Sequence, residues 1–194
     1  MKTIAAFDFD GTLTKTDTLV SFICYSQGYW KTIQALIRCL PYFMQFSLGL
    51  KSRQQVKEKL IAEVYGNVPY SAALCQGARF ASEKLDDYLL PERMDLLEWH
   101  KVHGHQCVLI SANFDLFLEP WGKRWGFEAV LCSKTSHRDN HITGKQDGLN
   151  CWGEEKVRKL LEWAGPKEEF ILYAYGDSAG DKELLKLADY PTKF

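Results

Sequence analysis

The sequence has no excess of charge of one sign and no long uninterrupted apolar run. Twenty-four Lys and Arg residues against 25 Asp and Glu residues give a formal net charge of -1, so we expect no nucleic-acid partner. The most apolar region, residues 32–50, has its longest uncharged run at 39–50, which is shorter than the ~18 to 20 residues of a membrane span. The apolar stretch at residues 4–7 is too short for a secretory signal. These absences predict a cytoplasmic protein.

The cysteines lack the close pairing that is typical of zinc sites. There is no CxxC or CxH motif, and the closest spacing, between Cys24 and Cys39, is 15 residues. Several cysteines lie in apolar runs, as Cys107 does in QCVLIS. We therefore predict small reduced core residues, as in a cytosolic protein, and a disulfide framework is the less favoured alternative.

What the sequence does contain is a set of short β-rich runs separated by helical patterns. Apolar runs at 3–9, 106–111 and 170–176, with a fourth at 128–132, predict strands covered on both faces. Helical patterns lie at 91–104, 115–126 and 153–165. This alternation predicts βαβ units and a parallel sheet flanked by helices, an α/β fold.

Residues 16–88 interrupt this rhythm. They contain several helical patterns and no good strand, so we expect an all-helical module inserted after the first strand. The remaining segments, 1–15 and 89–194, would form the α/β core. Within the insertion, we expect residues 32–50 to form a buried helical hairpin, because an amphipathic stripe usually packs in a core. An apolar face that touches membrane lipid is the alternative.

Polar side chains follow three of the predicted strands. Asp8 and Asp10 end the first, Ser111 ends the second and Asp177 ends the third, where ligands gather in an open parallel sheet. Lys156 begins the helix between the last two of these strand ends. Each residue alone could be a turn, a helix cap or a solvated charge. Together they are the groups that phosphoryl transfer requires.

These motifs resemble those of the haloacid dehalogenase-like hydrolases. The resemblance rests on DFDGTLT from Asp8, the strand end at Ser111, Lys156 and the GDSAGD run that contains Asp177. The helical insertion is similar to the first-position cap of that superfamily, and ITGKQDGLNCWGEEK is similar to its phosphoserine-phosphatase-like subgroup. The resemblance implies a Rossmann-like core and Mg²⁺-dependent phosphatase chemistry on a small phosphorylated substrate.

The chemistry assigns a role to each acid. Mg²⁺ prefers carboxylate, carbonyl and phosphate oxygens. Asp8 and Asp177 are placed to hold it, and the family pattern adds the backbone carbonyl of Asp10. Asp8 is the expected nucleophile, forming an aspartyl phosphate. The side chain of Asp10 is the expected general acid and base, for which neighbouring negative charge would supply a suitable pKa.

The other site residues are expected to hold the phosphoryl group. Lys156 would offset negative charge, while Ser111 and the groups of Ala112 and Asn113 would bind phosphoryl oxygens. For Asn113, a simple turn residue is the alternative. Asp181 would orient Lys156 or a metal-bound water.

Several alternatives stay open. Asp10 disfavours carbon–halogen hydrolysis, because a departing halide needs no proton. A phosphotransferase is a second alternative, because it forms the same aspartyl phosphate and differs only in the acceptor. A third, from another class of function, is a binding module that has kept the fold and lost the activity. Asp17 stands nine residues after Asp8, where phosphoserine phosphatases usually carry a glutamate. It is a possible substrate contact or a helix cap.

The apolar region 32–50 leads to a different substrate class. It is similar in position and character to the caps of bacterial phosphatidylglycerophosphate phosphatases, so a lipid phosphate is the alternative substrate.

The histidine cluster HKVHGH, from His100 to His105, is expected to be solvated at a helix end. The sequence indicates no oligomeric state.

Overall fold

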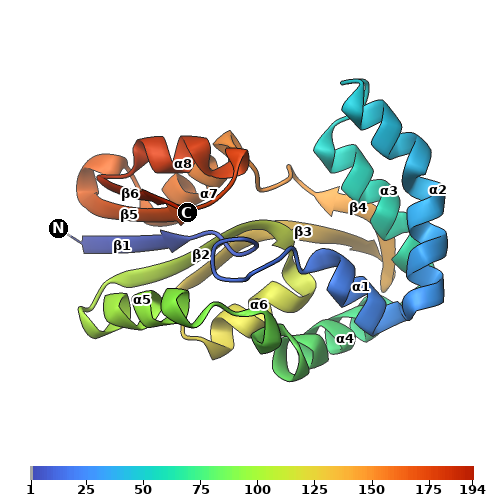
Figure 1. Cartoon of the computed structure of the whole chain (residues 1–194), viewed down its shortest axis with the longest axis horizontal. Helices are drawn as coiled ribbons and strands as arrows, with labels where there is room; N and C mark the ends of the chain where they lie inside the picture. The colour runs from blue at the N-terminus through green and yellow to red at the C-terminus, as the bar shows by residue number, and fades with distance from the viewer. Residues whose placement is uncertain (1) are drawn as a thin grey trace.

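The computed structural model describes residues 2–194 and contains one six-stranded sheet (Figure 1). The strand order is β4-β3-β2-β1-β5-β6. All neighbouring pairs are parallel except β3 and β4. The strands span Lys2–Phe7 (β1), Gln106–Phe114 (β2), Ala129–Arg138 (β3), His141–Asp147 (β4), Phe170–Gly176 (β5) and Tyr190–Lys193 (β6). Because β1 lies between β2 and β5, the three strand ends that carry the predicted site are neighbours.

Helices cover both faces of the sheet and form a group at one end (Figure 1). Their bounds are Leu19–Gln27 (α1), Tyr29–Ser47 (α2), Arg53–Tyr65 (α3), Tyr70–Glu83 (α4), Pro91–Val102 (α5), Asp115–Arg124 (α6), Glu154–Ala164 (α7) and Lys182–Leu187 (α8). Short 3₁₀ turns lie at Leu85–Tyr88 (η1), Lys167–Glu169 (η2) and Ala179–Asp181 (η3). The fold is therefore the predicted α/β class, a Rossmann-like and mostly parallel sheet between helices.

The alternation of β1 explains the two sides of the core. Ile4 and Ala6 pack with buried residues of α7 and α8, including Leu160. Ala5 and Phe7 point to the other face, in a cluster that includes residues of α5 and α6. Four of the six cysteines are buried, as predicted for core residues, whereas Cys75 is exposed and Cys24 is partly buried.

Two strands were not predicted. β3 continues past the expected run at 128–132 and turns back into β4 at Asp139 and Asn140, both of which have positive φ. Such residues are typical of tight hairpins, but β4 itself is too polar for its pattern to indicate a strand. β6 has only four residues and contains Pro191, which suits a sheet edge and gives little sequence signal.

Within the described residues 2–194, no strand of the sheet lies in the segment 16–88, which contains helices α1–α4. We propose that this segment is a cap inserted in a core formed by residues 1–15 and 89–194. This proposed cap packs directly on the core. The ring of Phe22 in α1 lies 4.8 Å from that of Phe117 in α6. A Cβ at Gly77 of α4 would lie 2.0 Å from the carbonyl oxygen of Leu116, so the two helix backbones are in contact there.

The expectation of a buried helical hairpin at 32–50 was wrong. This region belongs to one long helix, α2, which continues through Pro41. Only the small residues Thr32, Ala35 and Cys39 of α2 are buried, because α2 packs on its neighbours through that narrow face. Leu36 is partly buried against the core, but most of the large apolar side chains of α2 are exposed. No helix in residues 2–194 is long and apolar enough to cross a membrane.

The prediction for the histidines was wrong at His100, which is fully buried. Its Nε2 lies 2.7 Å from the Tyr175 hydroxyl, and its Nδ1 lies 2.7 Å from Nδ1 of His105. Burial lowers the pKa of His100 to about 4. The end of α5 packs on β5 at this point, a tertiary contact that the position at a helix terminus could not indicate.

Candidate active site

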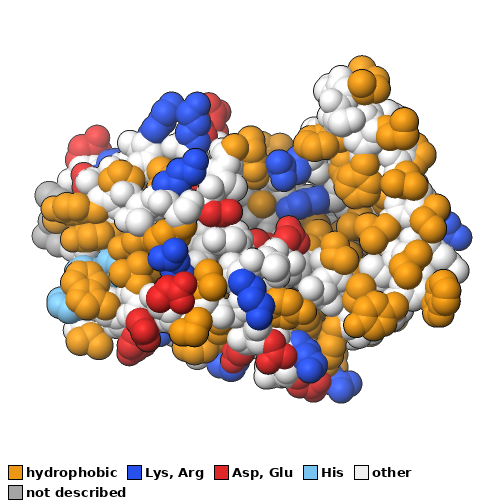
Figure 2. Space-filling model, viewed as in Figure 1, with side chains coloured by type: hydrophobic (Ala, Val, Ile, Leu, Met, Phe, Trp, Pro, Cys, Tyr) orange, Lys and Arg blue, Asp and Glu red, His pale blue; other side chains and the backbone are white. Residues whose placement is uncertain are grey.

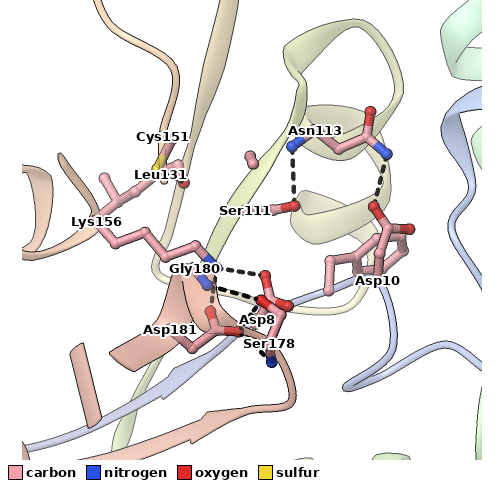
Figure 3. A network of polar contacts seen from close by, with 12 residues as sticks. Asp8, Asp10, Ser111, Asn113, Leu131, Cys151, Lys156, Ser178, Gly180 and Asp181 are labelled. Atoms are coloured by element: carbon pink, nitrogen blue, oxygen red, sulfur yellow. Dashed lines mark hydrogen bonds and ion pairs between the residues drawn. The ribbon is translucent and has the colours of Figure 1, made fainter. Parts of the chain in front are cut away.

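Asp8 follows β1 directly and is paired with a buried lysine (Figure 3). The Nζ of Lys156 lies 2.6 Å from Oδ1 of Asp8 and 2.5 Å from Oδ1 of Asp181. Burial raises the pKa of Asp8 to about 6, with Lys156 opposing the rise and Asp181 adding to it. Burial alone would lower the pKa of Lys156, but the two carboxylates raise it well above its usual range. Lys156 is therefore a fixed cation beside Asp8.

Asp181 is fully buried, and both of its carboxylate oxygens accept hydrogen bonds from other residues. Its second oxygen accepts hydrogen bonds from the backbone N–H of Ser178 at 3.0 Å and from the Ser178 hydroxyl at 2.7 Å. These bonds fix the carboxylate that holds Lys156. The geometry agrees with the expected role of Asp181 in orienting Lys156.

Asp177 follows β5 and brings a third carboxylate to the same place. Single oxygens of Asp8, Asp177 and Asp181 lie within 4.8 Å of one another. The Oδ1 of Asp177 is buried and has no hydrogen-bond partner within residues 2–194. Burial raises the pKa of Asp177, and the charge of Asp181 raises it further. An unpartnered oxygen among clustered carboxylates fits a hard divalent cation.

Gly11 makes room for this cluster. Its φ is +77°, and a Cβ there would lie 2.4 Å from Oδ2 of Asp177. Glycine alone adopts this backbone conformation freely and leaves space for the carboxylate. The turn after β1 therefore depends on Gly11, and it directs Asp10 away from the three clustered acids.

The Asp10 side chain is held by the start of α1 and by the β2 end. Its Oδ1 accepts hydrogen bonds from the Thr18 N–H at 2.9 Å and from the Thr18 hydroxyl at 2.7 Å. Its Oδ2 accepts one from Nδ2 of Asn113 at 2.8 Å (Figure 3). Burial raises the pKa of Asp10 to about 7, and the charges of Asp17 and Asp8 contribute to the rise. A carboxyl with this pKa can both give and take a proton near neutral pH.

The β2 end places Ser111, Ala112 and Asn113 beside the acids. Ser111 is buried, and its hydroxyl accepts a hydrogen bond from the backbone N–H of Asn113 at 3.1 Å. The Asn113 side-chain amide contacts Asp10 and the Thr18 hydroxyl. All three line one pocket of about 420 Å³ together with Asp8, Asp10, Lys156 and Asp177. The structure thus brings the three strand ends and the α7 lysine together, as predicted.

Asp17 lies at the rim of this pocket. Its side chain is exposed, and Oδ1 accepts a hydrogen bond from the backbone N–H of Leu19 at 2.9 Å. This is a helix-capping contact at the start of α1. Both interpretations of Asp17 agree with this position, since the cap contact leaves the residue facing the pocket.

Sequence reasoning missed the cations that α3 brings to the pocket. Lys57 donates a hydrogen bond to the carbonyl oxygen of Ala112 at 2.7 Å. Burial lowers the pKa of Lys57 to about 8, with the charges of Asp17 and Asp10 opposing the fall. Arg53 also lines the pocket, and its guanidinium lies 5.3 Å from the ring centre of Trp152. No sequence signal separates Lys57 from its neighbour Lys59; only the packing of α3 does.

The comparison with protein families agrees with this geometry. The family model of haloacid dehalogenase-like hydrolases matches residues 5–186. The chain belongs to the haloacid dehalogenase-like hydrolase family. The match spans the sheet, the strand ends and the inserted helices, so the chain is an enzyme of the hydrolase class.

Relatives and solved structures extend this assignment. The Caulobacter vibrioides protein CicA is 28% identical over 96% of this chain and 83% of its own. A histidinol-phosphatase from Neisseria meningitidis is 22% identical over 98% and 89%, respectively. A Bordetella pertussis structure of unknown function has a TM-score of 0.83 at 22% identity, covering 98% of this chain and 89% of that one.

A phosphoserine phosphatase, solved as a phospho-aspartyl intermediate analogue, has a TM-score of 0.64 at 20% identity, covering 99% of this chain and 85% of its own. At this identity the likeness shows the fold alone.

Proposed function

We propose that this protein is a Mg²⁺-dependent phosphomonoesterase that acts through an aspartyl phosphate on Asp8. One observation carries the proposal. Asp8 pairs with the buried cation of Lys156, and it clusters with Asp177, whose buried Oδ1 has no hydrogen-bond partner within residues 2–194. A phosphate dianion can approach a carboxylate nucleophile only where positive charge offsets their repulsion.

The residues present fit a bound Mg²⁺. Asp8 and Asp177 would hold it through their carboxylates, and Asp10 through its backbone carbonyl, which is an oxygen set that this ion prefers. When bound, Mg²⁺ supplies the charge that lets phosphate and carboxylate meet. Asp181 is a weaker candidate ligand, because Lys156 and Ser178 already occupy both of its oxygens.

The chain's own residues then divide the reaction. Asp8 attacks phosphorus in line with the leaving oxygen, and the protonated Asp10 gives its proton to the departing alkoxide. In the second half, Asp10 takes a proton from the water that attacks the aspartyl phosphate, and free phosphate leaves. Lys156 offsets charge on the transferring group, while Ser111 and the backbone at Ala112 and Asn113 hold its oxygens.

The pocket supports a small phosphorylated metabolite as the substrate. Its volume of about 420 Å³ is at the lower end of the range for small-molecule sites. Beyond the phosphate position, Arg53 and Lys57 supply positive charge, and Asp17 supplies negative charge. We propose a phosphomonoester whose alcohol carries further polar or charged groups that these three side chains meet.

The test is hydrolysis of 4-nitrophenyl phosphate. We expect turnover with Mg²⁺, loss of turnover with EDTA and recovery when Mg²⁺ is restored. Asp8→Asn should reduce turnover by ~10⁴-fold or more, while Asp87→Asn, at an exposed carboxylate, should change nothing. Full activity of Asp8→Asn or full activity in EDTA would contradict the proposal. A panel of phosphorylated metabolites then identifies the substrate.

A further inference from the structure

The outer side of α2 carries a continuous apolar stripe. Its members follow one another at intervals of three or four residues, so they share one side of the helix. We call this stripe the α2 face; it consists of Trp30, Ile33, Ile37, Leu40 and Met44. Trp30 is 79% exposed, Met44 66% and Ile37 59%. Figure 2 shows hydrophobic side chains gathered along this helix. Contiguous exposed apolar surface of this kind marks an interaction site.

The segment of the sequence that contains the α2 face carries charge of one sign. The sequence from residue 18 to residue 57 contains no Asp or Glu, although the chain as a whole carries a net charge of -1. It contains five basic residues: Lys31, Arg38, Lys51, Arg53 and Lys57. Lys31 and Arg38 are both exposed on α2, and Arg38 also pairs with Glu63 of α3 at 3.2 Å. Each immediately follows a stripe residue and they are seven residues apart, so both lie along one border of the α2 face.

The α2 face could be covered by a second copy of the chain or by a lipid surface, and its charge favours the lipid. In a symmetric dimer with antiparallel α2 helices, the basic borders of both copies would lie on the same side of the interface, where like charges repel. An anionic lipid surface is complementary to both features, because it takes apolar side chains below its head groups and attracts Lys and Arg at their level. Trp at such a boundary is also favourable.

We propose that the α2 face docks this protein on an anionic membrane surface. The five stripe residues enter the boundary between head groups and acyl chains, and Lys31 and Arg38 lie at the lipid phosphates. The helix lies on the membrane and does not cross it, in keeping with its exposed stripe and its narrow buried face. This docking is separate from the phosphatase chemistry, since no residue of the α2 face lines the active-site pocket.

The geometry places the docked helix next to the site. Phe46, near the end of α2, has its ring centre 5.8 Å from the guanidinium of Arg53. Arg53 lines the pocket that holds Asp8. The same two residues also line a neighbouring groove with Trp152 and the exposed Leu149. The end of α2 therefore lies at the rim of the pocket, on the side of the helix opposite to the α2 face.

The experiment measures flotation of the intact protein with vesicles, without substrate. We expect binding to phosphatidylcholine vesicles that contain about a third phosphatidylglycerol, and weak binding to pure phosphatidylcholine. The variant Ile33→Gln/Ile37→Gln/Met44→Gln should lower the bound fraction by about tenfold or more. Lys31→Gln/Arg38→Gln should lower binding to anionic vesicles by roughly fivefold per charge. Val102→Gln, at an exposed apolar residue of α5, should bind as the unaltered protein does.

Two further readouts keep the proposal open to refutation. Every variant should hydrolyse 4-nitrophenyl phosphate as the unaltered protein does, which shows that it is folded and keeps the two proposals apart. Trp30 emission should shift to the blue on adding anionic vesicles, and Trp30→Phe should lose most of that shift. Absence of binding to anionic vesicles would overturn the proposal. So would a stable dimer in light scattering that Ile33→Gln/Ile37→Gln/Met44→Gln converts to monomer, because a second copy would then cover the face.

Discussion

The core and the proposed cap use their side chains differently. In the core, parallel strand pairing fixes the positions of Asp8, Ser111 and Asp177, and the helices bury their apolar sides against the sheet. In the cap, α3 brings Lys57 and Arg53 to the pocket, while α2 leaves most of its large apolar side chains exposed. We propose that the core supplies the reaction, and that the helices of the cap supply selectivity and contacts with the surroundings.

The largest expected effect tests the core half of this comparison, at Lys156. Lys156→Met removes the only cation on Asp8 and Asp181 among the described ion pairs. We expect kcat to fall by about 10³-fold and the free energy of unfolding to fall by about 3 to 5 kcal/mol at neutral pH, because two buried carboxylates lose their partner. The loss of stability should shrink toward pH 5, where protonation relieves the unpaired charge. Activity is measured with 4-nitrophenyl phosphate and stability by urea unfolding.

The control for Lys156→Met is Lys159→Met, on the same helix but outside the pocket. It should leave both kcat and stability nearly unchanged. Equal effects of the two substitutions would show that kcat and stability depend on the integrity of α7 in general and not on the ion pair of Lys156.

A smaller effect is expected at Asp10, where core and cap meet. Asp10→Asn should lower kcat/KM by about 10²- to 10³-fold for alkyl phosphates, whose leaving oxygen needs a proton. For 4-nitrophenyl phosphate, with its good leaving group, the loss should be about tenfold or less.

The pH profile of the unaltered enzyme gives a second measure of Asp10. An acid must be protonated to act, and the pKa of Asp10 is raised to about 7. With alkyl phosphates, kcat/KM should therefore fall as the pH rises through about 7, and Asp10→Asn should abolish this limb. An equal loss for both kinds of leaving group would argue against general-acid catalysis.

The smallest of these effects tests the cap, at Lys57. Because the charges of Lys57 and Asp10 stabilise each other, Lys57→Met should raise the pKa of Asp10. The falling limb of the profile should move to higher pH by up to about one unit. KM for the identified substrate should rise by roughly threefold to tenfold with little change in kcat.

Lys59→Met is the matched control for Lys57, since Lys59 pairs with Glu63 at 2.6 Å, away from the pocket. It should change neither KM nor the pH profile. A large fall in kcat for Lys57→Met with KM unchanged would contradict the division of labour between core and cap.

More of the core than of the cap could be predicted from the sequence. The sheet, its central strands and the meeting of Asp8, Ser111, Lys156 and Asp177 could be predicted, because buried strands leave long apolar runs and parallel strand ends share one edge. Lys57 could not be predicted, because its place in the pocket depends on the packing of α3. The exposed side of α2 and the burial of His100 depend on which neighbour each surface meets. The hydrophobic pattern of one segment does not contain that information.

The close contact between Gly77 of α4 and Leu116 of α6 bears on how substrate enters the pocket and product leaves it. With the backbone of α4 against the carbonyl of Leu116, the two helices cannot separate without breaking close packing. The side chain of Asp86 adds to this seam, since it accepts hydrogen bonds from Trp121 and Arg124 of α6. We therefore expect the helical insertion to stay packed on the core at this contact during turnover. We then expect access to the pocket to depend on side chains at its rim, such as Arg53, whose guanidinium lies 5.3 Å from the ring centre of Trp152.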